Sequence, residues 1–312
     1  MQVHYDINNL PSFKNAVITA GTFDGVHTGH TRIIEQLKNE AAAIQGETVI
    51  ITFYPHPRKI ISGKEVFILN TPEEKIELLT AKGIDHLVVV PFNEVFSDQS
   101  PEAYISDFLV GKFHPRTIII GYDHKFGKGR KGDYHLVEEY GKKYGFAVKE
   151  IEQHIIDNVT ISSTKIREAL LAADIDTAGK YLGYDYFFEG LITEGNKLGR
   201  TIGYPTANLQ IKDADKLVPG NGVYAVTCTV LNENNKAGTL LQGMMNIGVR
   251  PTVDGTKRTI EVNIFNFNED IYGKMLRVYI KKYLRGEVKF NGLDELKAQL
   301  AKDKEMSLLF LQ

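Results

Sequence analysis

Short apolar runs alternate with longer stretches of helical spacing over roughly the first 180 residues. The strand-like runs cover residues 16–20, 48–53, 87–90, 117–120 and, more weakly, 147–151. Helical spacing follows the first run, from about residue 30 to 45, and helix-start signals open two more amphipathic stretches at Thr71-Pro72-Glu73-Glu74 and Ser100-Pro101. Strands that alternate with helices are typical of an open parallel α/β sheet, so this half predicts a Rossmann-like unit.

The pattern changes beyond about residue 181, where short β-rich runs are separated by glycine, asparagine and aspartate. Candidate strands cover residues 187–193, 223–230, 240–247, 259–267 and 276–283, and a closing helix covers residues 293–301. Five or more short strands of this kind favour a small antiparallel β-barrel. We therefore expect two domains, residues 1–182 and residues 183–312, joined within residues 172–186.

The composition is that of a globular chain with more than one core. Its 312 residues are 43% hydrophobic and 24% charged, and the formal net charge of −2 does not suggest a partner among nucleic acids or membrane surfaces. The first residues lack a signal-peptide pattern, and no apolar run reaches the roughly 18 residues of a membrane span. We expect a cytoplasmic protein that acts on small molecules, contacts neither nucleic acid nor membrane, and self-associates weakly if at all.

Cysteine chemistry contributes nothing to the expected function. The single cysteine, Cys228, can form neither an internal disulfide nor a cysteine metal cluster. We expect it to be a small buried residue of a strand.

The segment GTFDGVHTGH, residues 21–30, lies between the first strand-like run and the first helical stretch. Such a strand, glycine-rich turn and helix direct free backbone N–H groups and the positive end of a helix dipole to one point. His27 and His30 are three residues apart, so they face the same way on the first helical turn. Two imidazole donors, a helix N-terminus and Mg²⁺ suit nucleotidyl transfer, in which charge spreads over the α-phosphoryl oxygens. Glycine turns and single histidines are mostly structural, and it is their combination that indicates a phosphate site.

Three further segments fall at the carboxyl edge of the predicted sheet, where ligands bind in such folds. They are TFYPHPR (residues 52–58), GYDHKFG (residues 121–127) and ISSTKIR (residues 161–167). In the last, hydroxyl side chains can cap the following helix, and Lys165 and Arg167 supply cations that could hold ATP phosphates; a plain helix cap with solvated cations is the alternative. Asp123 could cap a backbone or orient a substrate or metal. His56 could serve the site or only fill its loop.

The second domain opens with GNKLGRTIGYPTANL, residues 195–209. Its glycines permit close approach of the backbone to phosphate oxygens, and Thr206 and Asn208 offer oxygen ligands suited to Mg²⁺. The order of residues is not that of a Walker A loop, so this would be a different solution to ATP binding. Composition alone also allows a glycine-rich β-loop with a turn at Tyr204-Pro205.

Glu261 stands in the strand-like sequence TIEVNIFNF, where alternation puts it on one face with Thr259 and Asn263. A lone glutamate in such a place is usually solvated. If the face instead looks into the glycine loop, Glu261 could take the proton from a substrate hydroxyl as that hydroxyl attacks a γ-phosphoryl group. Spacing leaves both alternatives open.

Seven motifs occur in an order that resembles the bacterial bifunctional riboflavin kinase/FMN adenylyltransferases, also called FAD synthetases. They are GTFDGVHTGH, TFYPHPR, GYDHKFG, ISSTKIR, GRTIGYPTANL, NIGVRPT and the strand of Glu261, and they span nearly the whole chain. The resemblance implies a Rossmann-like nucleotidyltransferase domain that transfers AMP from ATP to FMN. It also implies a small antiparallel β-barrel with a C-terminal helix that phosphorylates riboflavin to make that FMN, with Mg²⁺ in the chemistry.

The same resemblance assigns roles to individual residues. His27 and His30 should contact the ATP phosphates in the transition state, and Glu261 matches the catalytic base of the kinase. Asp123, Phe126 and Arg285 are expected at the flavin, and Thr206 and Asn208 at the metal. The residues implied at the nucleotide are Gly21, Phe23, Gly25, Gly29, Ser163, Thr164 and Arg167 in the first domain and Gly195, Gly199, Arg200 and Gly203 in the second.

Five positions depart from the pattern of many relatives, namely Tyr54, His124, Glu194, Asn263 and Asn266. They bear on flavin affinity, on pH dependence and on the balance of the two activities. Two other functions stay open on the residues alone: a nucleotidyltransferase for another phosphorylated acceptor such as phosphopantetheine, and a flavin- or nucleotide-binding regulator without turnover.

Overall fold

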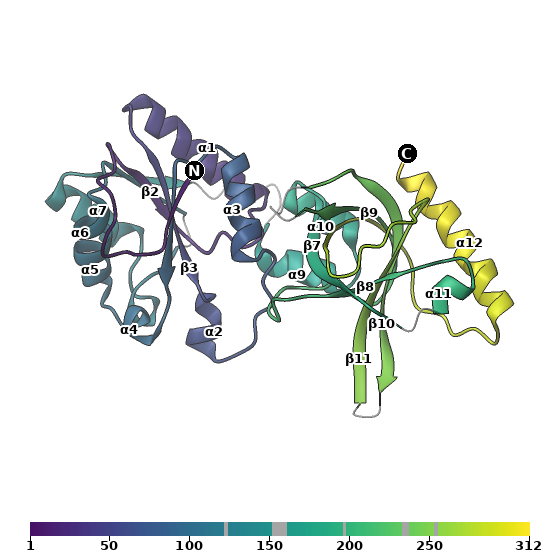
Figure 1. Ribbon diagram of the computed structural model, residues 1–312. Coiled ribbons are helices and arrows are strands. Elements are labelled where there is room, and N and C mark those ends of the chain that lie inside the picture. Colours follow the sequence, from purple (N-terminus) through teal and green to yellow (C-terminus); the bar gives the residue numbers. More distant parts are fainter. Residues whose placement is uncertain (122–123, 152–160, 196–197, 233–236, 253–254) are drawn as a thin grey trace. The chain divides into compact units, whose positions relative to one another are not determined.

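The computed structural model describes residues 1–121, 124–151, 161–195, 198–232, 237–252 and 255–312 (Figure 1). The chain divides into two compact units, Met1–Ser163 and Thr164–Gln312. The expected domain boundary at residues 182 and 183 stays a prediction.

The first unit is built on a parallel sheet with the strand order β1-β4-β3-β2-β5-β6. The strands are β1 Gln2–His4, β2 Val17–Ala20, β3 Thr48–Tyr54, β4 His86–Pro91, β5 Thr117–Gly121 and β6 Ala147–Ile151. Five of them match the strand-like runs of the sequence, so the α/β prediction is confirmed. The strand β1 was not predicted, because three residues at a sheet edge carry no readable alternation.

Helices cover both faces of this sheet (Figure 1). They are α1 Thr28–Ala43, α2 Pro57–Ser62, α3 Pro72–Ala81, α4 Glu94–Ser97, α5 Pro101–Ala103, the π-helix η1 Tyr104–Val110, α6 Gly111–Phe113, the 3-10 helix η2 Lys128–Arg130 and α7 Tyr134–Tyr144. Neighbouring strand residues point to opposite faces: Ile50 packs with α1 and α3, whereas Ile51 packs with η1 and α7. The four inner strands, β2 to β5, are largely apolar because both of their faces are buried.

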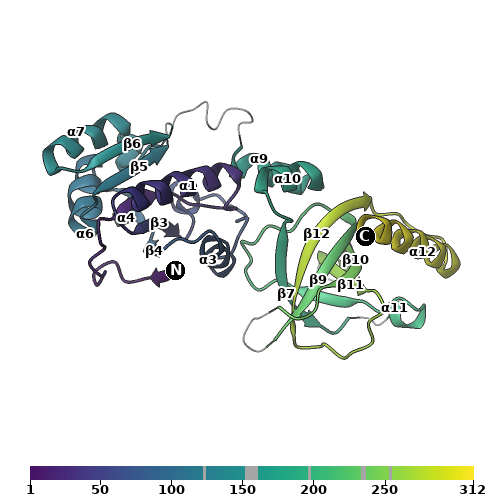
Figure 2. The same cartoon turned by 90° about the horizontal axis from the view of Figure 1, so that it is seen from above.

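The second unit contains a closed antiparallel barrel with the order β10-β11-β8-β7-β12-β9. Its elements are α9 Ser163–Leu171, whose first residue belongs to the first unit, α10 Ile175–Leu182, β7 Phe187–Thr193, α11 Leu198–Thr201, β8 Ala207–Gln210, β9 Gly222–Leu231, β10 Leu241–Thr252, β11 Gly255–Ile264, β12 Met275–Arg285 and α12 Leu293–Phe310. The helix α12 packs against β9, β10 and β12 (Figure 2). The predicted barrel and closing helix are confirmed, and Cys228 is buried in β9 as expected.

Three details of the barrel differ from the prediction. The end of the glycine-rich segment forms β8, which pairs with both β7 and β11 and so closes the barrel. The strand β11 ends at Ile264 rather than at residue 267, and Asn266 beyond it has a positive φ of 53° that breaks the extended chain. The closing helix continues nine residues past the predicted end, to Phe310.

The central strand β3 is buried along most of its length. Ile50 has 0% of its side chain exposed, whereas Ile61 on α2 is 66% exposed. We expect Ile50→Ala to lower the free energy of unfolding by about 2–5 kcal/mol, because it removes buried apolar contacts and leaves a cavity. The matched variant Ile61→Ala should change it by less than about 0.5 kcal/mol. Urea unfolding followed by circular dichroism measures both, and equal losses would contradict this packing.

Candidate active sites

The turn that joins β2 to α1 has a constrained backbone. Phe23, Gly25 and Val26 have positive φ values of 46°, 88° and 36°. Such a conformation costs a non-glycine residue about 1–2 kcal/mol, yet the side chains of Phe23 and Val26 are only 1% exposed. Their burial therefore helps to hold the turn in place and directs the chain into α1.

His27 and His30 lie together at the start of α1. His27 is the N-cap, and its Nδ1 accepts a hydrogen bond of 3.3 Å from the backbone N–H of His30. The two rings are stacked with centroids 3.7 Å apart and an interplanar angle of 17°. Because Nδ1 of His27 is an acceptor, a neutral His27 carries its proton on Nε2. The expected common orientation of the pair is thus present, while its catalytic role stays a prediction.

The surroundings of His30 favour its neutral form. Burial lowers the pKa of His30 well below its usual value, and the nearby His27 and Lys75 lower that pKa further. Its Nδ1 is buried and has no hydrogen-bond partner among the described residues. A buried ring nitrogen without a partner is unusual, and a bound ligand group would satisfy it.

Two charged residues beside this turn were not predicted from the sequence. The buried carboxylate of Asp24 accepts hydrogen bonds from the backbone N–H groups of Leu69 and Asn70, at 2.9 and 3.3 Å. Lys75 donates a hydrogen bond of 2.7 Å from Nζ to the carbonyl of Thr22. Both pair with residues more than 40 positions away, so spacing in the sequence gave no signal for them.

Of the other site residues predicted at the first site, the structure brings only some close to the histidine turn. Ser163 donates a hydrogen bond of 2.9 Å to the carbonyl of Asp24, so it joins the histidine turn. Thr164 and Arg167 lie on α9 in the second unit, and their contact with a nucleotide stays a prediction. Asp123 lies outside the described residues. Phe126 is buried and stacks on Tyr104 with ring centroids 4.9 Å apart.

In TFYPHPR, His56 has a local structural task. Its Nδ1 accepts a hydrogen bond of 3.1 Å from the backbone N–H of Arg58 and caps α2. Tyr54, one of the departures from the family pattern, is half exposed at the end of β3. A further role for this segment in binding stays a prediction.

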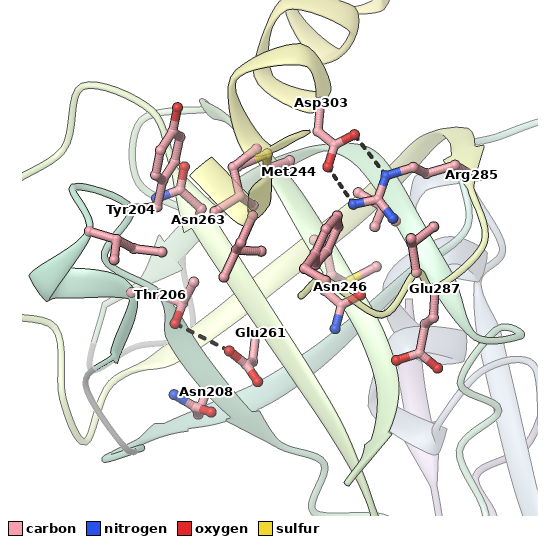
Figure 3. A pocket seen from close by; sticks show the side chains of 18 of the residues that line it. Tyr204, Thr206, Asn208, Met244, Asn246, Glu261, Asn263, Arg285, Glu287 and Asp303 are labelled. Carbon is pink, nitrogen blue, oxygen red and sulfur yellow. Dashed lines mark hydrogen bonds and ion pairs between the residues drawn. The ribbon is translucent and has the colours of Figure 1, made fainter. Parts of the chain in front are cut away.

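The barrel holds a pocket of about 240 Å³ (Figure 3). Its lining comes from the glycine-rich segment, from β10 and β11, from the end of β12 and from α12. The labelled side chains that line it are Tyr204, Thr206, Asn208, Met244, Asn246, Glu261, Asn263, Arg285, Glu287 and Asp303. Polar groups therefore lie beside apolar ones in one cavity, as is usual for a small-molecule site.

Glu261 faces the glycine-rich segment within this pocket. It is paired across the strands with Asn208, and its Oε2 lies 3.4 Å from the hydroxyl of Thr206. Arg250 forms an ion pair with the other carboxylate oxygen of Glu261. Of the two alternatives for Glu261, the structure has the inward one, with a side chain that is 14% exposed. Arg250 was missed because NIGVRPT was read only as a family motif.

Three glycines of this segment lie where a side chain would clash or where the backbone would be strained. A Cβ on Gly195 would lie 2.2 Å from the side-chain amide of Asn208, and one on Gly199 would lie 2.2 Å from the carbonyl of Tyr204. Gly203 has a φ of 87°, which larger residues adopt only with strain. Arg200, on α11, is exposed.

Arg285 is held at the pocket wall by α12. Its Nε and Nη2 donate hydrogen bonds of 2.9 and 2.7 Å to the two oxygens of Asp303. Asp303 is buried and accepts a third bond of 2.8 Å from Gln299. Sequence reasoning missed Asp303, because it ended the closing helix before that residue. Contact of Arg285 with a flavin stays a prediction.

Comparisons with known proteins match both units. The family model of FAD synthetase matches residues 10–165, and that of riboflavin kinase matches residues 182–311. The chain belongs to the bifunctional riboflavin kinase/FMN adenylyltransferase family. A member of this family from Haemophilus influenzae is 36% identical over 95% of this chain and 94% of its own length. One from Escherichia coli is 35% identical over 96% of this chain and 94% of its own.

A solved structure also shares the whole fold of this family member. It is described as a macrolide-efflux protein from Streptococcus pneumoniae, and it has a TM-score of 0.85, 29% sequence identity and 98% coverage of both chains. Among the described residues of the present chain, no helix has the length and apolar character needed to cross a bilayer. The likeness to the solved structure, with its TM-score of 0.85, supports the fold class given by the family.

The depressed pKa of His30 can be tested by titration. We expect the NMR signals of this imidazole to show no protonation as the pH falls through 6.5, the ordinary value. In that range the unfolded chain binds the proton and the folded chain does not, so stability falls with falling pH. His30→Gln identifies the signals and should lessen this fall in urea unfolding between about pH 7.5 and about pH 5.5. A His30 that titrates near its ordinary value would contradict the assignment.

Proposed function

We propose that this chain is an FAD synthetase that phosphorylates riboflavin to FMN in the barrel and transfers AMP from ATP to FMN in the first unit. The observation that carries the proposal is the barrel pocket, in which Glu261 faces Thr206 and Asn208. A nucleotidyltransferase for phosphopantetheine has no use for such a pocket. The membership of the chain in the bifunctional family supports the same conclusion.

In the first unit, His27 and His30 contact the phosphates of ATP. The anionic phosphate oxygen of FMN attacks the α-phosphorus, and the bond to pyrophosphate breaks as the new bond forms. A neutral imidazole stabilises the charge that develops on the phosphoryl oxygens by donating a hydrogen bond. The N-terminus of α1 adds the positive end of its dipole at the same point.

The nucleotide site of this unit extends beyond the histidines. The residues assigned to it are Gly21, Phe23, Gly25, Gly29, Ser163, Thr164 and Arg167. A Cβ on Gly29 would lie 3.1 Å from Nδ1 of His27, so glycine leaves room for the stacked ring. Asp123 and Phe126 are assigned to the flavin of this site.

In the barrel, Glu261 takes the proton from the riboflavin hydroxyl. The hydroxyl oxygen attacks the γ-phosphorus of ATP, and ADP leaves. Gly195, Gly199, Arg200 and Gly203 are assigned to the nucleotide, whose phosphates can approach the glycine backbone closely. Arg285, held by Asp303, is assigned to the flavin.

Members of this family use ATP and generally a divalent metal, which we propose is Mg²⁺ here. Thr206 and Asn208 fit it, because both offer neutral oxygens of the kind that Mg²⁺ accepts, and the Thr206 hydroxyl is 3.4 Å from Glu261. When bound, the ion would neutralise charge on the ATP phosphates. Gly195 leaves space for the side-chain amide of Asn208 where it lies.

We further propose that the protein works in the cytoplasm on small molecules alone, with no nucleic-acid or membrane partner and with weak self-association. The net charge of −2 supports the part of this proposal that concerns nucleic acids and membranes, because it offers no excess of cations for phosphate backbones or anionic lipids.

The two activities should separate by mutation. His30→Ala should lower FMN adenylylation by about 10²- to 10³-fold and spare riboflavin phosphorylation, whereas Glu261→Ala should lower phosphorylation by about 10²- to 10⁴-fold and spare adenylylation. Chromatography of riboflavin, FMN and FAD over time measures both steps. His135→Ala and Glu269→Ala are matched controls on exposed residues. Equal loss of both steps in each folded variant would contradict the assignment.

Removal of divalent metal should stop both reactions. EDTA is expected to abolish FMN and FAD formation, because the phosphate charge is then left without a counterion, and excess Mg²⁺ should restore it. Thr206→Val should raise the Mg²⁺ concentration needed for half-maximal phosphorylation by about tenfold or more and leave that for adenylylation unchanged. Full activity in EDTA, or restoration by another divalent ion alone, would overturn the proposal of Mg²⁺.

A further inference from the structure

Lys75 connects a helix to the histidine turn of the first unit. Thr71 and Glu74 form a capping box at the start of α3, in which each side chain bonds the backbone N–H of the other residue. Glu74 is buried, so the first turn of α3 is fixed in the unit. The next residue, Lys75, is therefore held in a defined direction as it reaches toward the sheet.

The Lys75 ammonium group contacts the turn directly. It donates hydrogen bonds of 2.7 Å to the carbonyl of Thr22 and 3.3 Å to the hydroxyl of Thr52. The Thr52 hydroxyl also lies 3.0 Å from that carbonyl and donates to it. Side chains from two elements that are far apart in sequence, α3 and β3, thus both donate hydrogen bonds to the Thr22 carbonyl of the turn.

Thr22 precedes the strained part of the turn. Phe23, Gly25 and Val26 follow it with left-handed backbone angles, which persist only where the surroundings over-determine them. The hydrogen bonds to the Thr22 carbonyl fix one end of that stretch. At its other end, His27 is the N-cap of α1.

We propose that Lys75 is a positioning residue of the adenylyltransferase site, whose ammonium group fastens the Thr22 carbonyl and thereby places His27 and His30 for the phosphates of ATP. This inference rests on the proposed role of the two histidines. Both hydrogen bonds of the Lys75 ammonium group go to Thr22 and Thr52, so the role we assign to it is exerted through the turn.

The charge of Lys75 supports the same role. Burial lowers the pKa of Lys75, and the carboxylate of Asp24 opposes that effect and favours the ammonium form. The charged and titratable groups that act on His30 are His27 from the same helix and Lys75 from α3. Loss of the Lys75 charge should therefore raise the pKa of His30.

The test compares Lys75→Met with Lys82→Met in the full chain. Lys82 caps the C-terminus of the same helix, and its side chain makes no hydrogen bond or ion pair with the described residues. Lys75→Met should lower kcat for FMN adenylylation by about tenfold to hundredfold, because a misplaced histidine pair loses transition-state contacts. KM for ATP should stay within about twofold, and riboflavin phosphorylation and Lys82→Met should match the wild type.

Two more variants keep the result decisive if Lys75→Met folds poorly. Thr52→Val removes the hydroxyl that also donates to the Thr22 carbonyl and should lower the same kcat by a smaller factor, and Lys75→Arg, which keeps the charge, should recover part of the loss. NMR should show a raised pKa for His30 in Lys75→Met and an unchanged one in Lys82→Met.

Wild-type adenylylation in Lys75→Met, or an equal loss of both activities in Lys75→Met and Thr52→Val, would overturn the inference. His30→Ala separates this failure from that of the proposed function. If His30→Ala abolishes adenylylation while Lys75→Met does not, only the role of Lys75 is wrong. If His30→Ala leaves adenylylation intact, the proposed role of the turn fails.

Discussion

The geometry of the first site depends on one buried carboxylate, that of Asp24. This carboxylate accepts hydrogen bonds from two consecutive backbone N–H groups, those of Leu69 and Asn70. The backbone carbonyl of Asp24 accepts a further hydrogen bond from the Ser163 hydroxyl. Hydrogen bonds to a charged group contribute about 1.5–3 kcal/mol each, which is enough to offset the left-handed residues on either side of it. These bonds therefore hold the turn that carries the stacked histidines.

The barrel organises its loop by a related interaction. Asn263 on β11 donates a hydrogen bond of 2.7 Å to the carbonyl of Pro205. That bond fixes the residue before Thr206, and the pairing of β8 with β11 sets Asn208 opposite Glu261. In the first unit the side chain of the turn bonds backbone groups of another segment, whereas in the barrel a strand side chain bonds the backbone of the loop.

Periodicity predicted most of the fold, because apolar strands such as β2 and β3 are buried on both faces and read clearly in the sequence. It failed for β1 and β8, which are short and owe their existence to partners distant in the chain. The site divided in the same way. His27 and His30 are neighbours on a helix and could be found by spacing, whereas Lys75 and Asp303 reach their partners through tertiary packing. Glu261 is intermediate between these two groups of residues. Alternation predicted which residues share its face of the strand, but only the closed barrel showed that this face points into the pocket.

The two sites differ in residue type because their attacking groups differ in protonation. The phosphate of FMN is already anionic near neutral pH, so its attack on ATP needs no base, and a neutral His30 suits the proposed role of donating a hydrogen bond to the developing charge. Riboflavin attacks through a hydroxyl whose proton must be removed, and Glu261 in the barrel pocket is the carboxylate that we propose accepts it. A depressed pKa of His30 and an ion-paired Glu261 are consistent with this division. An imidazolium in the first site would bind FMN and ATP more tightly in the ground state as well, and so would give less selective stabilisation of the transition state.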